Sequence, residues 1–124
     1  HGGGSFSFEG ARAALDQGFI SDVISTDLHT GCINGPTYDL PTTMSKMLFL
    51  GLSLEDVIER TTIAPARAIG RAHELGSLKV GSVADAAVLN LIDGEFTFFD
   101  TKKNKRVARQ RLVATHTIRG GELQ

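Results

Sequence analysis

The stretch DVISTDLHTGCINGPTYD, residues 22–39, carries the pattern on which the fold assignment depends. Val23 and Ile24 predict a short buried strand over residues 22–26, and this strand runs directly into Asp27. A polar, glycine-containing loop follows. Loops that leave the carboxyl ends of parallel strands are where α/β proteins hold their reactive groups. The stretch therefore predicts a functional site beginning at Asp27.

Helical patterns lie on both sides of this stretch. Upstream, Phe8, Ala11 and Leu15 are spaced as on one face of a helix, which Ser5 or Ser7 can cap and Gly18 can end. Downstream, three more helices are predicted from their capping residues: Asp39 with Pro41 and Gly51, Ser53 in the SLED sequence, and Pro65 with Gly70. The alternation of helix and strand is typical of an α/β fold with a parallel sheet.

The periodicity changes from that of helices to that of strands near residue 75. Strands are predicted within residues 76–91, 95–99 and 111–118, and Asp93–Gly94 predicts the hairpin turn. Three or four strands form a poor sheet by themselves, so we expect this part to belong to a larger β layer.

The composition is that of an ordinary globular domain and excludes several classes of protein. The 124 residues are 41% hydrophobic and 22% charged, with a formal net charge of -1, so no overall charge attracts nucleic acid or anionic membranes. No apolar run reaches the roughly 18 residues of a membrane span. The single cysteine, Cys32, excludes an internal disulfide and agrees with a cytoplasmic location.

Asp27 is the candidate for catalytic chemistry. A carboxylate suits Zn²⁺, Mn²⁺ or Fe²⁺ when combined with imidazole ligands, and beside a metal it can accept a proton from water. The alternative is a turn residue that caps the next segment. His29 and Cys32 follow closely, but zinc sites recruit separated pairs of ligands and no second pair is present. We therefore expect His29 and Cys32 to line the loop.

Three segments carry a resemblance to a known family: VISTDLHTG at 23–31, LPTTMSKMLFLGLSLEDVIERTTIAPARAIG at 40–70 and LGSLKVGSVADAAVLNL at 75–91. Together they resemble the C-terminal part of an amidohydrolase-superfamily metal-dependent hydrolase, closest to the dihydroorotase-like amidohydrolase/deacetylase group. The resemblance implies that residues 1–75 are the last βα units of a TIM barrel. Residues 76–124 would be strands of the small β-sandwich domain, so that the fold is incomplete by itself.

The resemblance also implies site residues and a reaction. Asp27 ends strand eight of the barrel, where it is a metal ligand and the general base for a water that attacks an amide, a cyclic amide or a related ester. A similar H-G-x-G-S-F stretch closes strand seven in that group, which makes His1 a substrate-facing residue. The predicted substrate-binding residues are His1, His29, Asn34, Gly35 and Pro36.

The sequence lacks most of what such a site needs. A barrel takes about 250 residues, and no H-x-H pair or bridging lysine is found here. One or two divalent metals, Zn with Mn or Fe as alternatives, would then be held mostly by residues outside this chain. We expect the chain alone to be catalytically silent and to require the remainder of the barrel, in the parent chain or as a separate chain. A homo-oligomer is also expected.

A second interpretation belongs to a different class of protein. The basic stretch at 102–111 holds six lysine and arginine residues without an acid, and such a patch can contact phosphates or nucleic acid. The alternative is a solvated hairpin edge, in which the charges prevent aggregation. No aromatic residue alternates with the basic ones, which favours the hairpin edge. A third interpretation is a non-catalytic assembly module without a metal.

Overall fold

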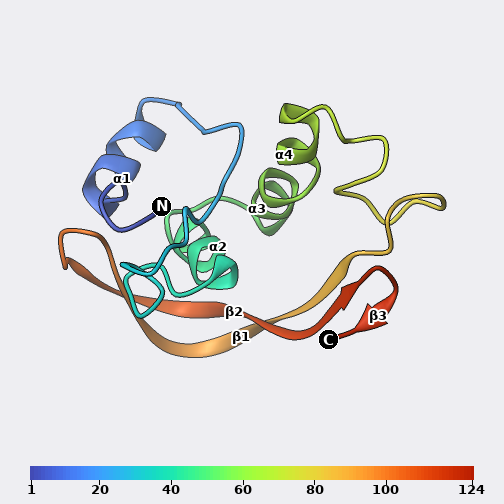
Figure 1. Cartoon of the computed structure of the whole chain (residues 1–124). Helices are drawn as coiled ribbons and strands as arrows, with labels where there is room; N and C mark the ends of the chain where they lie inside the picture. Colours follow the sequence, from blue (N-terminus) through green and yellow to red (C-terminus); the bar gives the residue numbers. More distant parts are fainter.

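The computed structural model describes all 124 residues, and its helices come before its strands. In Figure 1 the helices lie over one face of a long, curved antiparallel sheet. The bounds of the elements are α1 Phe8–Asp16, α2 Leu40–Phe49, α3 Leu54–Thr61, α4 Ile63–Ala68, β1 Ala86–Phe99, β2 Lys105–Arg119 and β3 Glu122–Leu123. None of the four helices has the length and apolar character that crossing a membrane requires.

The predicted helix caps are confirmed. The side chains of Ser7, Asp39 and Ser53 accept hydrogen bonds from the backbone N–H of Gly10, Thr42 and Asp56, at 3.1, 2.7 and 3.1 Å. Each bond satisfies an N–H that the first turn of a helix leaves without a partner. The glycines expected after α1, α2 and α4 are found there with positive φ: Gly18, Gly51 and Gly70. Local sequence therefore fixes the ends of these helices.

The strand expected over residues 22–26 is not formed. Residues 19–27 contain no strand, although Ile24 is buried and its N–H donates to the carbonyl of Arg60 at 2.8 Å. A strand requires a hydrogen-bonded neighbour along its length. His1 and Gly2 bond to Ser25 and Thr26 on one side, and Arg60 bonds to Ser21 and Ile24, but these contacts form no continuous strand pairing.

The hairpin turn expected at Asp93–Gly94 is also wrong. β1 continues through these residues with an irregularity between Asp93 and Phe96, and the turn to β2 lies at residues 100–104. The aromatic run that follows Gly94 extends the strand, while the Asp100 side chain supplies the hydrogen bonds of the turn. The apolar segment at residues 78–80, expected to form part of a strand, is an exposed loop instead.

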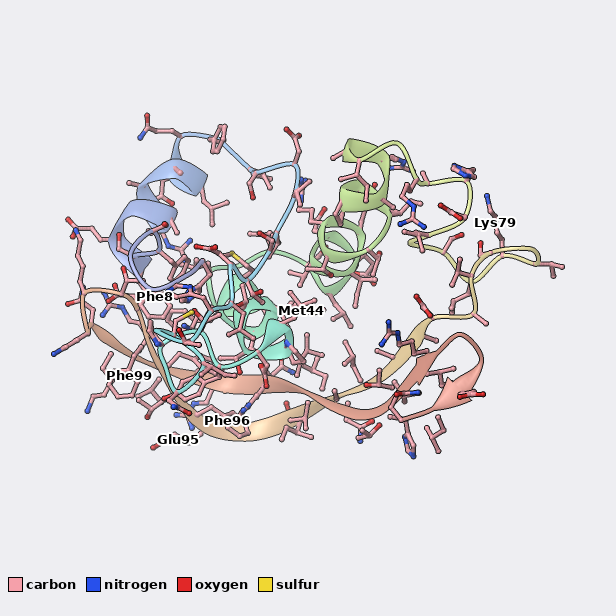
Figure 2. The ribbon with its side chains drawn as sticks, viewed as in Figure 1. Phe8, Met44, Lys79, Glu95, Phe96 and Phe99 are labelled. Carbon is pink, nitrogen blue, oxygen red and sulfur yellow. The ribbon has the colours of Figure 1, made fainter.

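Two apolar clusters join the helices to the sheet. The larger contains Phe6, Phe8, Leu50, Phe98 and Ala108, and the smaller contains Met44, Val57 and Leu112. Figure 2 shows Phe8 between α1 and the hairpin, and Met44 on the central helix α2. Burying a side chain of this size contributes about 2 kcal/mol to stability. These clusters pack α2 directly on β2.

The turn between β1 and β2 also holds the start of α1. Asp100 is 1% exposed, and its carboxylate accepts hydrogen bonds from the backbone N–H of Phe8, Lys102 and Asn104 and from the Asn104 side chain, at 2.8–3.1 Å. Burial by itself would raise the pKa of Asp100, but these hydrogen bonds outweigh it and leave the pKa below its usual value.

This lowered pKa predicts a pH-dependent contribution to stability. A carboxyl group with a lowered pKa in the folded state stabilises above its unfolded pKa of about 3.9, and the contribution is lost as pH falls through the folded value. We expect Asp100→Asn to lower the free energy of unfolding by about 2 kcal/mol at pH 7, and by much less at pH 3. Urea unfolding at the two pH values measures this difference.

Asp93→Asn is the control, because Asp93 is exposed and its side chain accepts only one hydrogen bond, from Gln110. The interpretation of Asp100 is wrong if Asp100→Asn lowers stability equally at pH 7 and pH 3.

Candidate functional site around Asp27

The first two residues of the chain lie against the segment that ends in Asp27. The backbone nitrogens of His1 and Gly2 donate to the carbonyl oxygens of Ser25 and Thr26, at 3.2 and 2.7 Å. Gly2 is buried and has a φ of +54°, a conformation that favours glycine. A Cβ at this position would overlap Oδ2 of Asp27. Gly2 therefore leaves the space that the Asp27 carboxylate occupies.

The Asp27 carboxylate is exposed and takes part in no hydrogen bond or ion pair. The hydrogen bonds at this residue involve its carbonyl oxygen, which accepts from the His29 ring and the Cys32 thiol. The backbone is left-handed, with a φ of 49°. An aspartate in a tight turn usually bonds a nearby backbone N–H, and this one does not. The carboxylate is therefore free of hydrogen bonds to other residues of this chain.

The predicted loop residues His29 and Cys32 lie next to Asp27. Nδ1 of His29 is 2.9 Å from the carbonyl oxygen of Asp27 and 3.4 Å from Sγ of Cys32. A carbonyl oxygen only accepts, so Nδ1 carries the proton and Nε2 of the neutral ring has a free lone pair. His29 is exposed and Cys32 is buried. The ring therefore presents a hydrogen-bond acceptor at Nε2.

Of the remaining predicted site residues, Asn34, Gly35 and Pro36 lie in the loop and His1 lies at the start of the chain. Asn34 is exposed and Gly35 is half-buried, with a φ of 118° and a cis peptide bond to Pro36. The Pro36 carbonyl accepts a hydrogen bond from Lys46. His1 is half-buried, and both of its ring nitrogens have partners within the chain. The structure thus places His29 beside Asp27 and the His1 backbone beside Ser25, while the His1 ring points to Thr37 and Lys46 and Asn34 is exposed on the loop.

Lys46 and Thr37 lie beside the His1 ring and were not predicted. Both side chains are fully buried. Nζ of Lys46 lies 2.7 Å from each of three acceptors: the His1 ring and the carbonyl oxygens of Pro36 and Phe99. Burial lowers the pKa of Lys46 to about 8, against an opposing effect of the Asp100 charge. One signal was present in the sequence, because Lys46 is the only charged residue within α2.

The residues of this chain can supply one ligand to a metal ion but not a complete set of ligands. The free carboxylate of Asp27 is a suitable oxygen ligand. However, the structure contains no group of three or more histidine, cysteine, aspartate or glutamate side chains placed to hold an ion.

The basic stretch at 102–111 forms the hairpin turn and the first half of β2. Two of its three arginines have partners on the molecule: Arg106 lies 5.5 Å from the centre of the Phe8 ring, and Arg109 is 3.8 Å from the Glu95 carboxylate. Lys102 and Lys103 are exposed at the turn. This is the arrangement expected of a charged hairpin edge.

Comparison with known proteins identifies the family. The profile of the amidohydrolase family matches residues 7–118. The chain belongs to the amidohydrolase family. The resemblance found in the sequence is thereby confirmed.

Curated relatives of this amidohydrolase include a deacetylase from Brucella anthropi, 44% identical over 98% of this chain and 30% of the relative. A deacetylase from Agrobacterium fabrum is 38% identical over 98% of this chain and 30% of its own length. The chain therefore spans about a third of the length of these relatives.

Two crystal structures superpose on the whole chain. An adenine deaminase matches with a TM-score of 0.94 and 36% identity, and a dihydroorotase with a TM-score of 0.90 and 37% identity. The chain covers 34% and 33% of these two structures. The arrangement of helices and hairpin described above is thus also found in two crystal structures.

Proposed function

We propose that this chain is the C-terminal part of a metal-dependent amidohydrolase that hydrolyses an amide, a cyclic amide or a related ester. The observation that carries the proposal is the free Asp27 carboxylate, exposed and set against the buried Gly2. In this proposal residues 1–75 are the last βα units of a TIM barrel. Residues 76–124 are part of the β-sandwich, which agrees with helices ending at Ala68 and strands beginning at Ala86.

Asp27 has two roles in the proposed reaction. Its carboxylate provides one ligand to a divalent metal, Zn with Mn or Fe as alternatives, and the other ligands come from residues outside this chain. When bound, the metal acidifies water and polarises the scissile carbonyl. The second role of the Asp27 carboxylate is to accept the proton of the attacking water and pass it to the leaving group. Its freedom from other hydrogen bonds leaves an oxygen for this transfer.

The loop that follows Asp27 forms the substrate side of the site. His29 presents the unprotonated Nε2, which accepts a hydrogen bond from an N–H or O–H of the substrate. Asn34, Gly35 and Pro36 shape the outer part of this loop, and His1 lies at its inner end. The deacetylase relatives favour an acetylated substrate.

The chain depends on the remainder of the barrel, in the parent chain or as a separate chain. With only one ligand residue it has no activity by itself. We propose a homo-oligomer in the cytoplasm, where the free thiol of Cys32 stays reduced.

Removal of metal tests the proposed function. The protein that carries this chain is assayed for release of acetate from N- and O-acetylated compounds and for ring opening of cyclic amides. Dialysis against dipicolinate is expected to reduce turnover to background, and Zn²⁺, Mn²⁺ or Fe²⁺ to restore it, because the metal activates the water.

Dialysis against the same buffer without chelator is the control. Full turnover in protein shown by elemental analysis to be free of metal would contradict the proposal.

A further inference from the structure

Lys46 is a buried cation whose position the proposed reaction does not explain. It lies on α2, and its side chain is fully buried. Its ammonium group connects three segments that are far apart in sequence: the start of the chain at His1, the loop at Pro36 and the end of β1 at Phe99. It is thus placed where the helix layer, the loop and the sheet meet.

The hydrogen bonds of Lys46 determine the state of the His1 ring. An ammonium group has three donors and no acceptor, and here each donor meets one acceptor at 2.7 Å. Nε2 of His1 must therefore accept, which leaves the proton on Nδ1. Nδ1 is 2.9 Å from the carbonyl oxygen of Gly2 and 2.9 Å from Oγ1 of Thr37. Lys46 thereby fixes both the tautomer and the orientation of the ring.

Contacts on every side hold the His1 ring in this orientation. The ring stacks on Phe6 with centroids 4.7 Å apart and an angle of 19° between the planes. Thr37 is fully buried, and its hydroxyl donates to the carbonyl oxygen of Gly2 at 3.1 Å. The His1 ring, the Thr37 hydroxyl and the Gly2 carbonyl oxygen are therefore joined by hydrogen bonds to one another.

Gly2 connects the His1 ring to Asp27, because it contacts both residues. Its N–H donates to Thr26, and the space of its missing side chain is filled by Oδ2 of Asp27. A displacement of the His1 ring would move Gly2, and with it the wall against which the carboxylate rests. The path from Lys46 to Asp27 consists of direct contacts only.

Stability does not account for a charge at position 46. No carboxylate lies within ion-pair distance of Lys46, and the oxygens of Asp100 are already bonded to the hairpin turn and Phe8. Burying an ammonium group that has no carboxylate within ion-pair distance costs several kcal/mol, and an apolar side chain of similar length avoids this cost at the expense of the three hydrogen bonds. Burial lowers the pKa of Lys46 to about 8, which agrees with such a cost.

We propose that Lys46 is a positioning residue that, through His1 and Gly2, holds the Asp27 carboxylate in its reactive place. This inference rests on the proposed function of Asp27. It assigns Lys46 no contact with substrate or metal. The charge is used to keep three hydrogen bonds in a fixed geometry, which an uncharged side chain cannot do.

The test replaces Lys46 with methionine and with glutamine in the whole protein. For Lys46→Met we expect kcat to fall by about 30-fold with a much smaller change in KM, as for residues that orient a reactive group through another. The melting temperature is expected to fall by only a few degrees, because removal of the buried charge offsets part of the cost of leaving the three acceptors of Lys46 without a donor. Lys46→Gln keeps part of the hydrogen bonding and is expected to lose less activity. If Lys46→Met does not fold, the activity of Lys46→Gln is the test instead. Lys105→Met is the matched control, because Lys105 is exposed on β2.

A measurement independent of activity separates this inference from the proposed function. In protein with ¹⁵N-labelled histidine, the His1 signals of the wild type should show protonated Nδ1 and unprotonated Nε2, and Lys46→Met should move them. If the wild type hydrolyses none of the substrates, the proposed function fails and the histidine signals still decide the contact. Wild-type kcat in a folded Lys46→Met variant, or unchanged His1 signals in either variant, overturns the role of Lys46.

Discussion

Replacing Asp27 with asparagine is expected to lower kcat of the whole protein by about 10³-fold, the size of effect that loss of a general base produces. Asparagine keeps the volume of the side chain and removes the charge, so it can neither accept the proton nor bind a metal as a carboxylate. The Asp27 backbone has a φ of 49°, and asparagine tolerates this conformation as well as aspartate does. The fold should therefore be unchanged.

Steady-state kinetics and circular dichroism of the same sample measure both expectations. Asp22→Asn is the control, because Asp22 is an exposed aspartate of the same segment, five residues upstream. Metal content should fall in Asp27→Asn and stay constant in Asp22→Asn. Wild-type turnover in Asp27→Asn would remove Asp27 from the mechanism.

Replacing Gly2 with alanine is expected to lower kcat by about 10²-fold, because a displacement of about 1 Å at a reactive group costs this much. The added Cβ would overlap Oδ2 of Asp27, so the carboxylate or the backbone must move. The positive φ of Gly2 adds a conformational cost of about 1 kcal/mol for any other residue. The effect on turnover should therefore exceed the effect on stability.

Gly4→Ala is the matched control for this variant. A Cβ at Gly4 has no atom within 4 Å, and its backbone is not left-handed. Kinetics and thermal unfolding of the two variants, measured in parallel, separate crowding at Asp27 from a general effect of alanine near the start of the chain. Equal kcat in Gly2→Ala and Gly4→Ala would show that the contact between Gly2 and Asp27 has no part in catalysis.

The helix ends could be predicted because they depend on neighbouring residues. Ser7, Asp39 and Ser53 each bond an N–H three residues further along the chain, so the pattern is visible in a short window of sequence. The strand over 22–26 and the turn at Asp93–Gly94 could not be decided in this way. Both depend on which distant segment pairs with the strand, and the pairing partner of a strand is not encoded locally.

The candidate site was predicted in part for the same reason. Asp27 and His29 follow from one short stretch, and the expectation that His1 faces the substrate came from the family resemblance. Lys46 was missed because its burial results from contacts with residues 45 positions before it and 53 after it. A lysine within a helix is usually solvated. Only the folded arrangement shows that this one is enclosed.

The contacts of the hairpin turn affect the order in which the parts of the chain fold. The Phe8 N–H bonds to Asp100 and the Phe6 carbonyl to Thr101, across 92 and 95 residues of sequence. Contacts of such long range form late, after the intervening chain has collapsed. During synthesis, Asp27 leaves the ribosome before Phe99 and Asp100 do. Phe6 and Phe8 reach their final packing only when the hairpin is in place, and only then can Lys46 bind the Phe99 carbonyl.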